Sequence, residues 1–483
     1  MILNKLKQLS ILIAALAGLT VKAQETSQRT SKPNFVFIMP DQWRGQALGF
    51  LGIEPVMTPH LDALAKESHV FTQAIANYPV CSPSRAMMMT GQLPLENGVW
   101  SNVNSATAPY GIELAPDKIC WSNLLKEAGY TNAWIGKWHL DSPHEPYVPT
   151  YNNKGKVAWN EWTPPDRRPG FDFWYAYGTY DRHLRPMYWD THAKRDEFKY
   201  VDQWGPEHEV DKALEFIEQL DGKTPFSVTL SINPPHSVYS HVPDKYLAMY
   251  KDLPVAELAK QPGIPAADTE MGKLYRNTIQ QYYAAITGVD EQIGRLVKGL
   301  KDKGLMENTV LIFLSDHGNC LGRNGEHAKN NHFEESLRIP AMIYWKNRIK
   351  PNMDNKSLFS LLDLYPTILG LLGVEDKQSV PGTDFTDLLV HGKPVNVKHQ
   401  FFMGRINPRN TSGGFRGVRT AEYKLAYVKN RPVDKPQVYL YNVANDPYDQ
   451  QNIADAHPEV VKELTRELKV WLKKADDPFL SDI

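Results

Sequence analysis

The sequence contains little cysteine. Cys81, Cys120 and Cys320 are the only cysteines among 483 residues, so the chain cannot carry the dense disulfide framework of a small secreted scaffold. At most one disulfide can form among the three. Neither positive nor negative charge is in excess, because 54 Lys and Arg residues balance 55 Asp and Glu residues. The near-neutral charge and the lack of a basic block argue against a nucleic-acid partner or an anionic membrane surface.

Long apolar runs are also missing after the first two dozen residues, so no membrane span is predicted in the mature chain. The first residues have a different pattern. Two lysines precede an apolar stretch over residues 11–19, and residues 21–23 offer a small-residue cleavage site. This pattern predicts a signal peptide over residues 1–23, cleaved near Ala23, with an uncleaved anchor as the alternative. A periplasmic or secreted location follows for the mature protein.

Continuous apolar runs and helical patterns alternate through most of the chain. The runs over Asn34–Pro40 and Thr309–Leu314 are typical of strands buried on both faces of a parallel sheet. Residues Phe226–Ile232 predict a further strand. Residues 273–302 have the periodicity of an amphipathic helix that covers such a sheet. We therefore predict an α/β catalytic domain over residues 24–395.

The composition changes near residue 395. Short strand patterns follow over residues 399–404, 417–420, 423–428 and 437–441, and a helical pattern covers 458–474. These patterns predict a smaller C-terminal α+β subdomain over residues 396–483, built from an antiparallel sheet and a terminal helix.

An aromatic, proline-rich insertion covers residues 141 to about 205 and shows little periodicity. Irregular segments of this length in compact domains are usually functional or disordered. The density of Trp and Tyr favours an ordered loop over a cleft. Arg182 and His183, in Y-D-R-H, are candidates for substrate contact, and a solvated turn is the alternative.

The segment C-S-P-S-R-A-M-M-M-T-G begins at Cys81 and predicts a loop that becomes a helix. Pro83 suits the first helical turn, and Gly91 suits the end. Cys81 then lies at a helix N-terminus, where free N–H groups favour an anion. Arg85, one turn further, can add a forked cation. A structural cysteine on a buried helix is the alternative for Cys81 taken alone.

Acidic residues follow two of the predicted strands. Asp41 comes after the first strand and Asp316 after the strand that ends at residue 314. Because the carboxyl ends of parallel strands meet at one edge of a sheet, the two side chains should lie close together. Two neighbouring carboxylates repel unless a cation lies between them. Oxygen ligands favour Ca²⁺, with Mg²⁺ as the alternative, and Gln42 and His317 are adjacent.

Basic side chains follow other strands. Lys137 and His139 alternate on one face of an extended segment after the strand at residues 131–136, which suits an anionic substrate. His236 follows the strand at residues 226–232. Each of these residues taken alone is equally compatible with a surface or loop position.

Together these segments resemble the signature of the type I sulfatases, in the alkaline phosphatase-like superfamily. The similar motifs are C-S-P-S-R with T-G, D-Q, G-K-W-H-L, P-P-H and S-D-H-G, and the resemblance runs from Asn34 to the C-terminus. It implies a large, mixed and mostly parallel sheet sandwiched by helices. It also implies a sulfuric ester hydrolase whose Cys81 is oxidised to formylglycine (3-oxoalanine) by a formylglycine-generating, or sulfatase-maturating, enzyme.

The resemblance implies roles for individual residues. The catalytic set is Cys81, Arg85, Lys137, His139, His236 and Lys329, and the metal set is Asp41, Gln42, Cys81, Asp316 and His317. In the family a formylglycine hydrate attacks the sulfur and the lysines bind the sulfate. We expect His236 to protonate the leaving sugar oxygen, with Lys329 or His332 as alternates. Gln42 and His317 depart from the commoner Asp and Asn, so a direct bond from Gln42 to the metal remains open.

The expected substrate is a sulfated carbohydrate, for example a galactose or N-acetylgalactosamine sulfate. Further candidates for substrate contact are Arg323, Asn324 and His332. Two other functions remain open: a phosphonate or phosphodiester hydrolase of the same superfamily, and a non-catalytic sulfated-glycan binding protein with unmodified Cys81. The complete G-K-W-H-L block favours the sulfatase.

Overall fold

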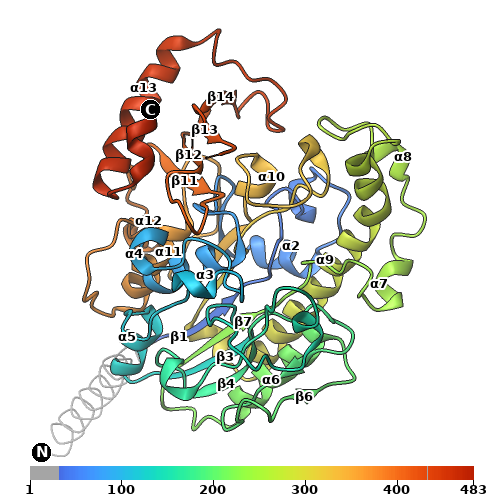
Figure 1. The fold of residues 1–483 in the computed structure, drawn as a ribbon. Coiled ribbons are helices and arrows are strands. Elements are labelled where there is room, and N and C mark those ends of the chain that lie inside the picture. Colours follow the sequence, from blue (N-terminus) through green and yellow to red (C-terminus); the bar gives the residue numbers. More distant parts are fainter. Residues whose placement is uncertain (1–31, 432) are drawn as a thin grey trace, which may run out of the picture. The chain divides into compact units, whose positions relative to one another are not determined.

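An eight-stranded sheet forms the centre of residues 34–483 in a computed structural model that describes residues 32–431 and 433–483. The strand order is β10-β2-β9-β8-β1-β7-β3-β4 (Figure 1). In chain order the strands are β1 Asn34–Ile38, β2 His69–Phe71, β3 Thr131–Lys137, β4 Phe173–Tyr177, β7 Phe226–Ser231, β8 Thr309–Leu314, β9 Ala341–Tyr344 and β10 Asn352–Asp354. Only β9 runs antiparallel to its neighbours. The predicted mixed, mostly parallel sheet is confirmed.

Helices cover both faces of this sheet. One apolar cluster contains side chains of α2, α6 and α9, and the other contains side chains of α3, α5, α11 and α12. The helices are α2 Pro59–Ala65, α3 Cys81–Thr90, α4 Pro94–Asn97, α5 Trp121–Glu127, α6 Gly205–Glu218, α7 Asp244–Ala248, α8 Val255–Leu258, α9 Glu270–Asp302, α10 Glu334–Leu337, α11 Leu361–Leu372, α12 Thr386–His391 and α13 Pro458–Lys474. None of the helices within the described residues has the length and apolarity to cross a membrane.

The burial of strand β1 on both faces explains why its residues after Asn34 are all apolar. Val36 packs into the cluster with α2, α6 and α9, whereas Phe35 and Phe37 pack into the cluster on the opposite face. Successive side chains of a strand point to opposite faces, so a strand covered on both sides has no position for a solvent-facing polar residue. Asp41 is the first charged residue after this strand.

The expectation of an irregular loop over residues 141–205 is partly wrong. Residues 173–177 form β4, which pairs with β3 and completes the edge of the central sheet. Its sequence, F-W-Y-A-Y, is rich in the aromatic residues that strands favour, and proline and glycine precede it. The rest of the insertion contains the two-stranded pair β5 Met187–Tyr188 and β6 Lys199–Tyr200.

A second, four-stranded antiparallel sheet lies near the C-terminus, with α13 beside it (Figure 1). Its strands are β11 Gln400–Gly404, β12 Gly414–Arg419, β13 Tyr423–Lys429 and β14 Gln437–Asn442, so β12 begins three residues before the predicted strand. The predicted α+β subdomain architecture is confirmed, while the boundary at residue 395 stays a prediction. The predicted signal peptide lies outside the described residues.

Candidate active site

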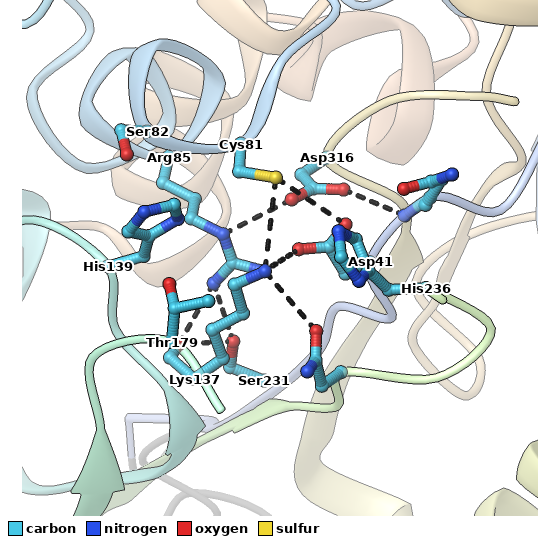
Figure 2. Close-up of polar contacts among 12 residues, drawn as sticks. Asp41, Cys81, Ser82, Arg85, Lys137, His139, Thr179, Ser231, His236 and Asp316 are labelled. Carbon is cyan, nitrogen blue, oxygen red and sulfur yellow. Dashed lines mark hydrogen bonds and ion pairs between the residues drawn. The ribbon is translucent and has the colours of Figure 1, made fainter. Parts of the chain in front are cut away.

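Four neighbouring strands deliver the central residues of the site. Strands β8, β1, β7 and β3 lie side by side and run parallel, so their carboxyl ends meet at one edge of the sheet. Asp316, Asp41, Ser231 and Lys137 come from these four ends. The first two and Lys137 lie around Cys81, whereas Ser231 lies beside the Arg85 guanidinium (Figure 2). Strand order and direction thus determine which side chains meet, as ligand sites in open α/β sheets generally show.

Four buried residues form a potential metal site. One ligand atom each from Asp41, Cys81, Asp316 and His317 lies within 4.8 Å of the others. His317 Nδ1 donates to the Gly318 carbonyl at 2.9 Å, which leaves the lone pair of Nε2 to face the cluster. Nε2 lies 3.4 Å from Asp41 Oδ1 and 3.4 Å from Cys81 Sγ.

The electrostatics of this cluster fit a bound cation. Burial and the neighbouring Asp41 carboxylate raise the pKa of Asp316, because two buried negative charges at this separation repel. Burial also acts to raise the pKa of Asp41, but Lys137, Lys329 and His236 together hold it well below its usual range. A divalent ion between the carboxylates would relieve the remaining repulsion. The carboxylates and one imidazole nitrogen suit such an ion.

Cys81 begins helix α3, as predicted, and Gly91 ends it with a φ of 69°. The N-terminal amide of Ser82 donates to Asn102 Oδ1 at 3.1 Å, so this N–H does not face the cluster. Burial acts to raise the pKa of the Cys81 thiol, but Lys137, Lys329 and His317 hold it well below the ordinary value. Position 81 therefore lies in a strongly electropositive environment.

Arg85 lies 1% exposed beneath Cys81 and bridges the two aspartates. Its Nε donates to Asp316 Oδ2 at 3.1 Å and Nη2 donates to Asp41 Oδ2 at 3.2 Å. Nη1 donates to the Lys137 carbonyl and to Ser231 Oγ. The guanidinium thus orients both carboxylates from the protein side, in the planar fork geometry that arginine provides.

Two lysines approach Cys81 from different parts of the chain. Lys137 Nζ lies 2.7 Å from Asp41 Oδ2 and 3.8 Å from Cys81 Sγ. Lys329 Nζ lies 3.1 Å from the same sulfur and donates to Gln42 Oε1 at 2.8 Å. Gln42 Nε2 donates to the Tyr239 hydroxyl, so both ends of the Gln42 amide have partners at the edge of the cluster.

His139 is buried with one ring nitrogen engaged. Nε2 lies 3.0 Å from the Val103 carbonyl, which can only accept, so Nε2 carries the hydrogen. Nδ1 then has a lone pair, and it has no hydrogen-bond partner among the residues the structure describes. Burial lowers the pKa of His139 and outweighs the opposing effect of Cys81. A neutral imidazole beside Cys81 (Figure 2) has the protonation state of a general base.

His236 is paired with a carboxylate that comes from the insertion. Its Nδ1 lies 2.7 Å from the Ser237 carbonyl and 3.4 Å from Asp181 Oδ1. Asp181 is itself held by Asn152 Nδ2 at 2.7 Å and Asn233 Nδ2 at 3.2 Å. Because both acceptors face Nδ1, Nε2 is the nitrogen that can exchange a proton with another group.

Charge also favours the protonated form of His236. Burial lowers the pKa of His236, and so do Lys329 and Lys137. Asp41 and the hydrogen bond to Asp181 act in the opposite direction and raise the pKa to about 9. His139 and His236 therefore have pKa values shifted to opposite sides of neutrality, the pattern expected when one acts as base and the other as acid.

Arg182 and His183, two of the candidates for substrate contact, lie in different environments. Arg182 is exposed, with its guanidinium 3.9 Å from the centre of the Tyr151 ring. His183 is buried, and its Nε2 contacts the carbonyls of His236 and Ser237. The structure therefore places His183 behind the His236 loop, where it supports that loop.

Arg323, Asn324 and His332 have internal partners. Arg323 is 1% exposed, pairs with Glu335 and donates to the Pro262 carbonyl. Asn324 Nδ2 donates to the Tyr448 carbonyl. His332 lies among aromatic rings of the second sheet, its Nε2 3.3 Å from the Tyr441 hydroxyl, and burial lowers its pKa to about 3. A histidine that remains neutral in this position is a poor alternate acid.

Ser231 and Asn233 also organise the site but were not predicted from the sequence, and neither was the role of Asp181 beside His236. Asn233 Oδ1 accepts from Lys137 Nζ at 3.2 Å and Ser231 Oγ donates to the Lys137 carbonyl at 2.6 Å. The available signal was a polar residue at the end of a buried strand for Ser231 and just past it for Asn233. Asp181 belongs to the Y-D-R-H segment predicted to contact substrate, but nothing local indicated its distant partner, His236.

The second sheet supports the Lys329 segment. Arg405 N donates to Asn330 Oδ1 at 2.8 Å, and Arg419 pairs with Glu334 of α10. These contacts link the C-terminal strands to the loop that carries Lys329. Cys120 and Cys320 are buried and free in the structure, so the open possibility of a disulfide between them is not realised.

Comparisons with known proteins agree on one family. A family model described as Sulfatase matches residues 33–374, and one described as N-sulphoglucosamine sulphohydrolase, C-terminal, matches residues 322–476. The endo-4-O-sulfatase of Bacteroides thetaiotaomicron is 34% identical, with 95% of each chain covered. The ulvan-active sulfatase of Formosa agariphila is 33% identical, covering 95% of this chain and 85% of its own.

A solved structure is also similar over nearly the whole chain. The candidate sulfatase yidJ from Bacteroides fragilis is 49% identical with a TM-score of 0.90, covering 94% of this chain and 99% of its own.

Proposed function

Since this chain belongs to the sulfatase family and is a sulfuric ester hydrolase, we propose that it releases sulfate from a sugar within an anionic glycan, with N-acetylgalactosamine or galactose 4-sulfate as the first candidates. One observation carries the proposal: position 81 lies between a buried carboxylate pair and two lysine ammonium groups. Relatives that are named for 4-O-sulfate and ulvan support a carbohydrate substrate.

Two groups would complete this site in the active enzyme. Asp41, Asp316, His317 and the side chain at position 81 would hold a divalent ion, which we propose to be Ca²⁺, with Mg²⁺ as the alternative. Gln42 would lie at its edge. The ion supplies positive charge next to the nucleophile and the sulfate. Formylglycine at position 81 supplies a hydroxyl nucleophile in place of the thiol, and a formylglycine-generating enzyme would be required to produce it.

The remaining residues bind the sulfate and move protons. Lys137 and Lys329 would bind sulfate oxygens and offset the charge that repels a nucleophile, because their ammonium groups are already held in place. His139, neutral and with a free Nδ1, would accept a proton from the side chain at position 81. His236, protonated and held by Asp181, would donate its Nε2 proton to the leaving sugar oxygen. Arg85 would hold both aspartates during the cycle.

We also propose that the mature protein is exported to the periplasm or beyond. This part of the proposal is supported by the N-terminal sequence alone. Release outside the cytoplasm would bring the enzyme to extracellular glycans.

Sulfate release from a panel of sulfated mono- and disaccharides tests the proposed function. The protein would be produced together with a formylglycine-generating enzyme, and peptide mass spectrometry would verify the lighter aldehyde at position 81. Cys81→Ala provides the blank. We expect release from one sulfated position above all others. Absence of release from the panel and from longer glycans, with the aldehyde verified, would overturn the proposal. Faster turnover of phosphonate esters would favour the other hydrolase.

A further inference from the structure

A pocket lies in the segment that flanks Asp181, the carboxylate that faces His236. It has a volume of about 340 Å³, within the range of small-molecule sites. The residues that line it are Pro149, Tyr151, Lys154, Tyr180, Arg182, Arg185 and Tyr200. All of them belong to the insertion between β3 and α6. We refer to this site as the insertion pocket.

The insertion pocket has an excess of positive charge. Three of its lining residues are basic and none is acidic. Arg185 Nε donates to Asp202 Oδ1 at 2.9 Å, which satisfies part of its charge. Arg182 and Lys154 are exposed and form no ion pair within residues 32–431 and 433–483. The Arg182 guanidinium stacks on the Tyr151 ring at 3.9 Å, so it is held in place with its edge open to an anion.

Aromatic surface accompanies this charge. Tyr151 and Tyr200 are each 42% exposed, and Tyr180 packs near Tyr200 with ring centres 6.2 Å apart. Exposed rings of this kind present an apolar face together with a polar hydroxyl edge. Such a surface suits a sugar ring, which has apolar C–H faces and polar hydroxyl groups. The combination of tyrosine faces and an arginine fork favours a sugar that carries an oxyanion.

Direct contacts connect the pocket to the proposed acid. Tyr180 and Arg182 line the pocket, and Asp181, between them in sequence, lies 3.4 Å from the His236 imidazole. The Tyr180 carbonyl accepts from Asn233 Nδ2 at 2.9 Å, and Asn233 also accepts from Lys137. Because adjacent Cα atoms are about 3.8 Å apart, the backbone that carries Tyr180 and Arg182 lies directly beside the carboxylate that faces His236, so a neighbouring sugar of a glycan bound at His236 could reach this pocket.

We propose that the insertion pocket is a subsite for the anionic sugar adjoining the sugar that loses its sulfate. Arg182 binds its oxyanion, a uronate carboxylate or a second sulfate, and Tyr151 packs against its ring. The inference rests on the proposed function and extends it, since it makes the preferred substrate a glycan with anionic groups on neighbouring sugars. A monosaccharide sulfate occupies the catalytic centre alone and leaves the pocket unused.

Binding to the Cys81→Ala protein tests the subsite without turnover. Titration calorimetry would compare unsulfated hyaluronan and chondroitin tetrasaccharides, which carry uronates, with chitotetraose, which is neutral. A carrageenan tetrasaccharide, sulfated but without uronate, tests the other source of the oxyanion. We expect at least one anionic ligand to bind more tightly than chitotetraose. Arg182→Ala should weaken that binding about tenfold, the usual effect of losing one charge-assisted contact.

Two further variants sharpen the test. Arg348→Ala is the matched control, because Arg348 is also an exposed arginine stacked on an aromatic ring, at 5.0 Å from the Trp345 ring centre. It should leave binding unchanged. Arg182→Lys keeps the charge but loses the fork, so it should restore part of the affinity. Anionic ligands that bind no better than chitotetraose, or equal effects of Arg182→Ala and Arg348→Ala, would overturn the subsite.

The mature enzyme gives a second readout. Arg182→Ala should lower kcat/KM more for a sulfated tetrasaccharide than for the corresponding sulfated monosaccharide, and equal losses on both would count against the subsite. An inactive enzyme with verified formylglycine would instead contradict the proposed function, while the binding comparison would still decide the subsite.

Discussion

Replacing Asp181 with asparagine removes the negative charge that faces His236 and preserves the size of the side chain. Asp181 Oδ1 lies 3.4 Å from His236 Nδ1, and the Ser237 carbonyl, at 2.7 Å, would still orient the ring. Burial lowers the pKa of His236, as do the two lysines, whereas Asp41 and Asp181 raise it to about 9. Asp181→Asn therefore tests whether His236 needs a carboxylate to remain protonated.

The expected magnitude follows from the protonated fraction. Without Asp181, burial and the two lysines are opposed by Asp41 alone, so the pKa of His236 should fall from about 9 toward its ordinary value of 6.5. A group with that pKa is protonated in roughly one molecule in ten at pH 7.5. We expect kcat/KM for a sugar sulfate to fall by up to about tenfold at pH 7.5, to fall further at pH 8.5 and to recover largely near pH 6. The wild-type profile should decline only near pH 9.

The assay measures kcat/KM from pH 6 to 9.5 on the preferred sugar sulfate and on 4-methylumbelliferyl sulfate, with formylglycine content matched between proteins. The aryl alcohol leaves without a proton, so Asp181→Asn should change the rate of aryl sulfate hydrolysis little. The sugar alcohol needs a general acid, so hydrolysis of the sugar sulfate should slow. A loss of the same size on both substrates, or one independent of pH, would show that Asp181 acts through structure alone and would refute the assigned role of His236.

Three further predictions concern the metal, the sheet and a buried acid. Asp316→Asn should weaken Ca²⁺ binding at least about tenfold by calorimetry because it removes one of two carboxylates; unchanged affinity would exclude Asp316 as a ligand. Gly136→Ala should cost about 2–4 kcal/mol in urea unfolding, since its φ is 99° and the new Cβ would lie 2.1 Å from the Ser231 carbonyl oxygen. Gly155→Ala, whose nearest atom would be 3.9 Å away, is the control that should change stability little. Glu209→Gln should gain stability over wild type as pH rises, because burial raises the pKa of Glu209 to about 8 despite the hydroxyls of Tyr188 and Tyr177. The stability from protonated Glu209 is complete below its unfolded pKa of about 4.5 and is lost as pH rises through 8, by about 5 kcal/mol at most. If Glu209→Gln changed the free energy of unfolding equally at pH 4 and pH 8.5, the raised pKa of Glu209 would be contradicted.

The sequence by itself determined the elements whose signals are local. After their first residues, β1 and β8 are apolar because both faces are covered, and β7 alternates apolar residues with small hydroxyl residues. Each strand is followed by polar residues of the site. Helix α3 begins at Cys81 and ends at Gly91, where proline and glycine chemistry predicted its bounds. Because the contiguous motifs lie at these junctions, Asp41, Cys81, Lys137 and Asp316 were all identified before any contact between them was known.

Only the tertiary structure decided which distant groups meet. Asp181 and His236 are 55 positions apart, and Lys329 reaches Gln42 across 287 positions; such pairs depend on strand order and loop packing, which leave no local periodicity. Strand β4 was missed because its aromatic run is short and lies within an irregular segment. Arg323 and His332 looked available for substrate, yet both are buried against internal partners. Burial of a polar side chain depends on the groups that satisfy it, and those groups come from elsewhere in the fold.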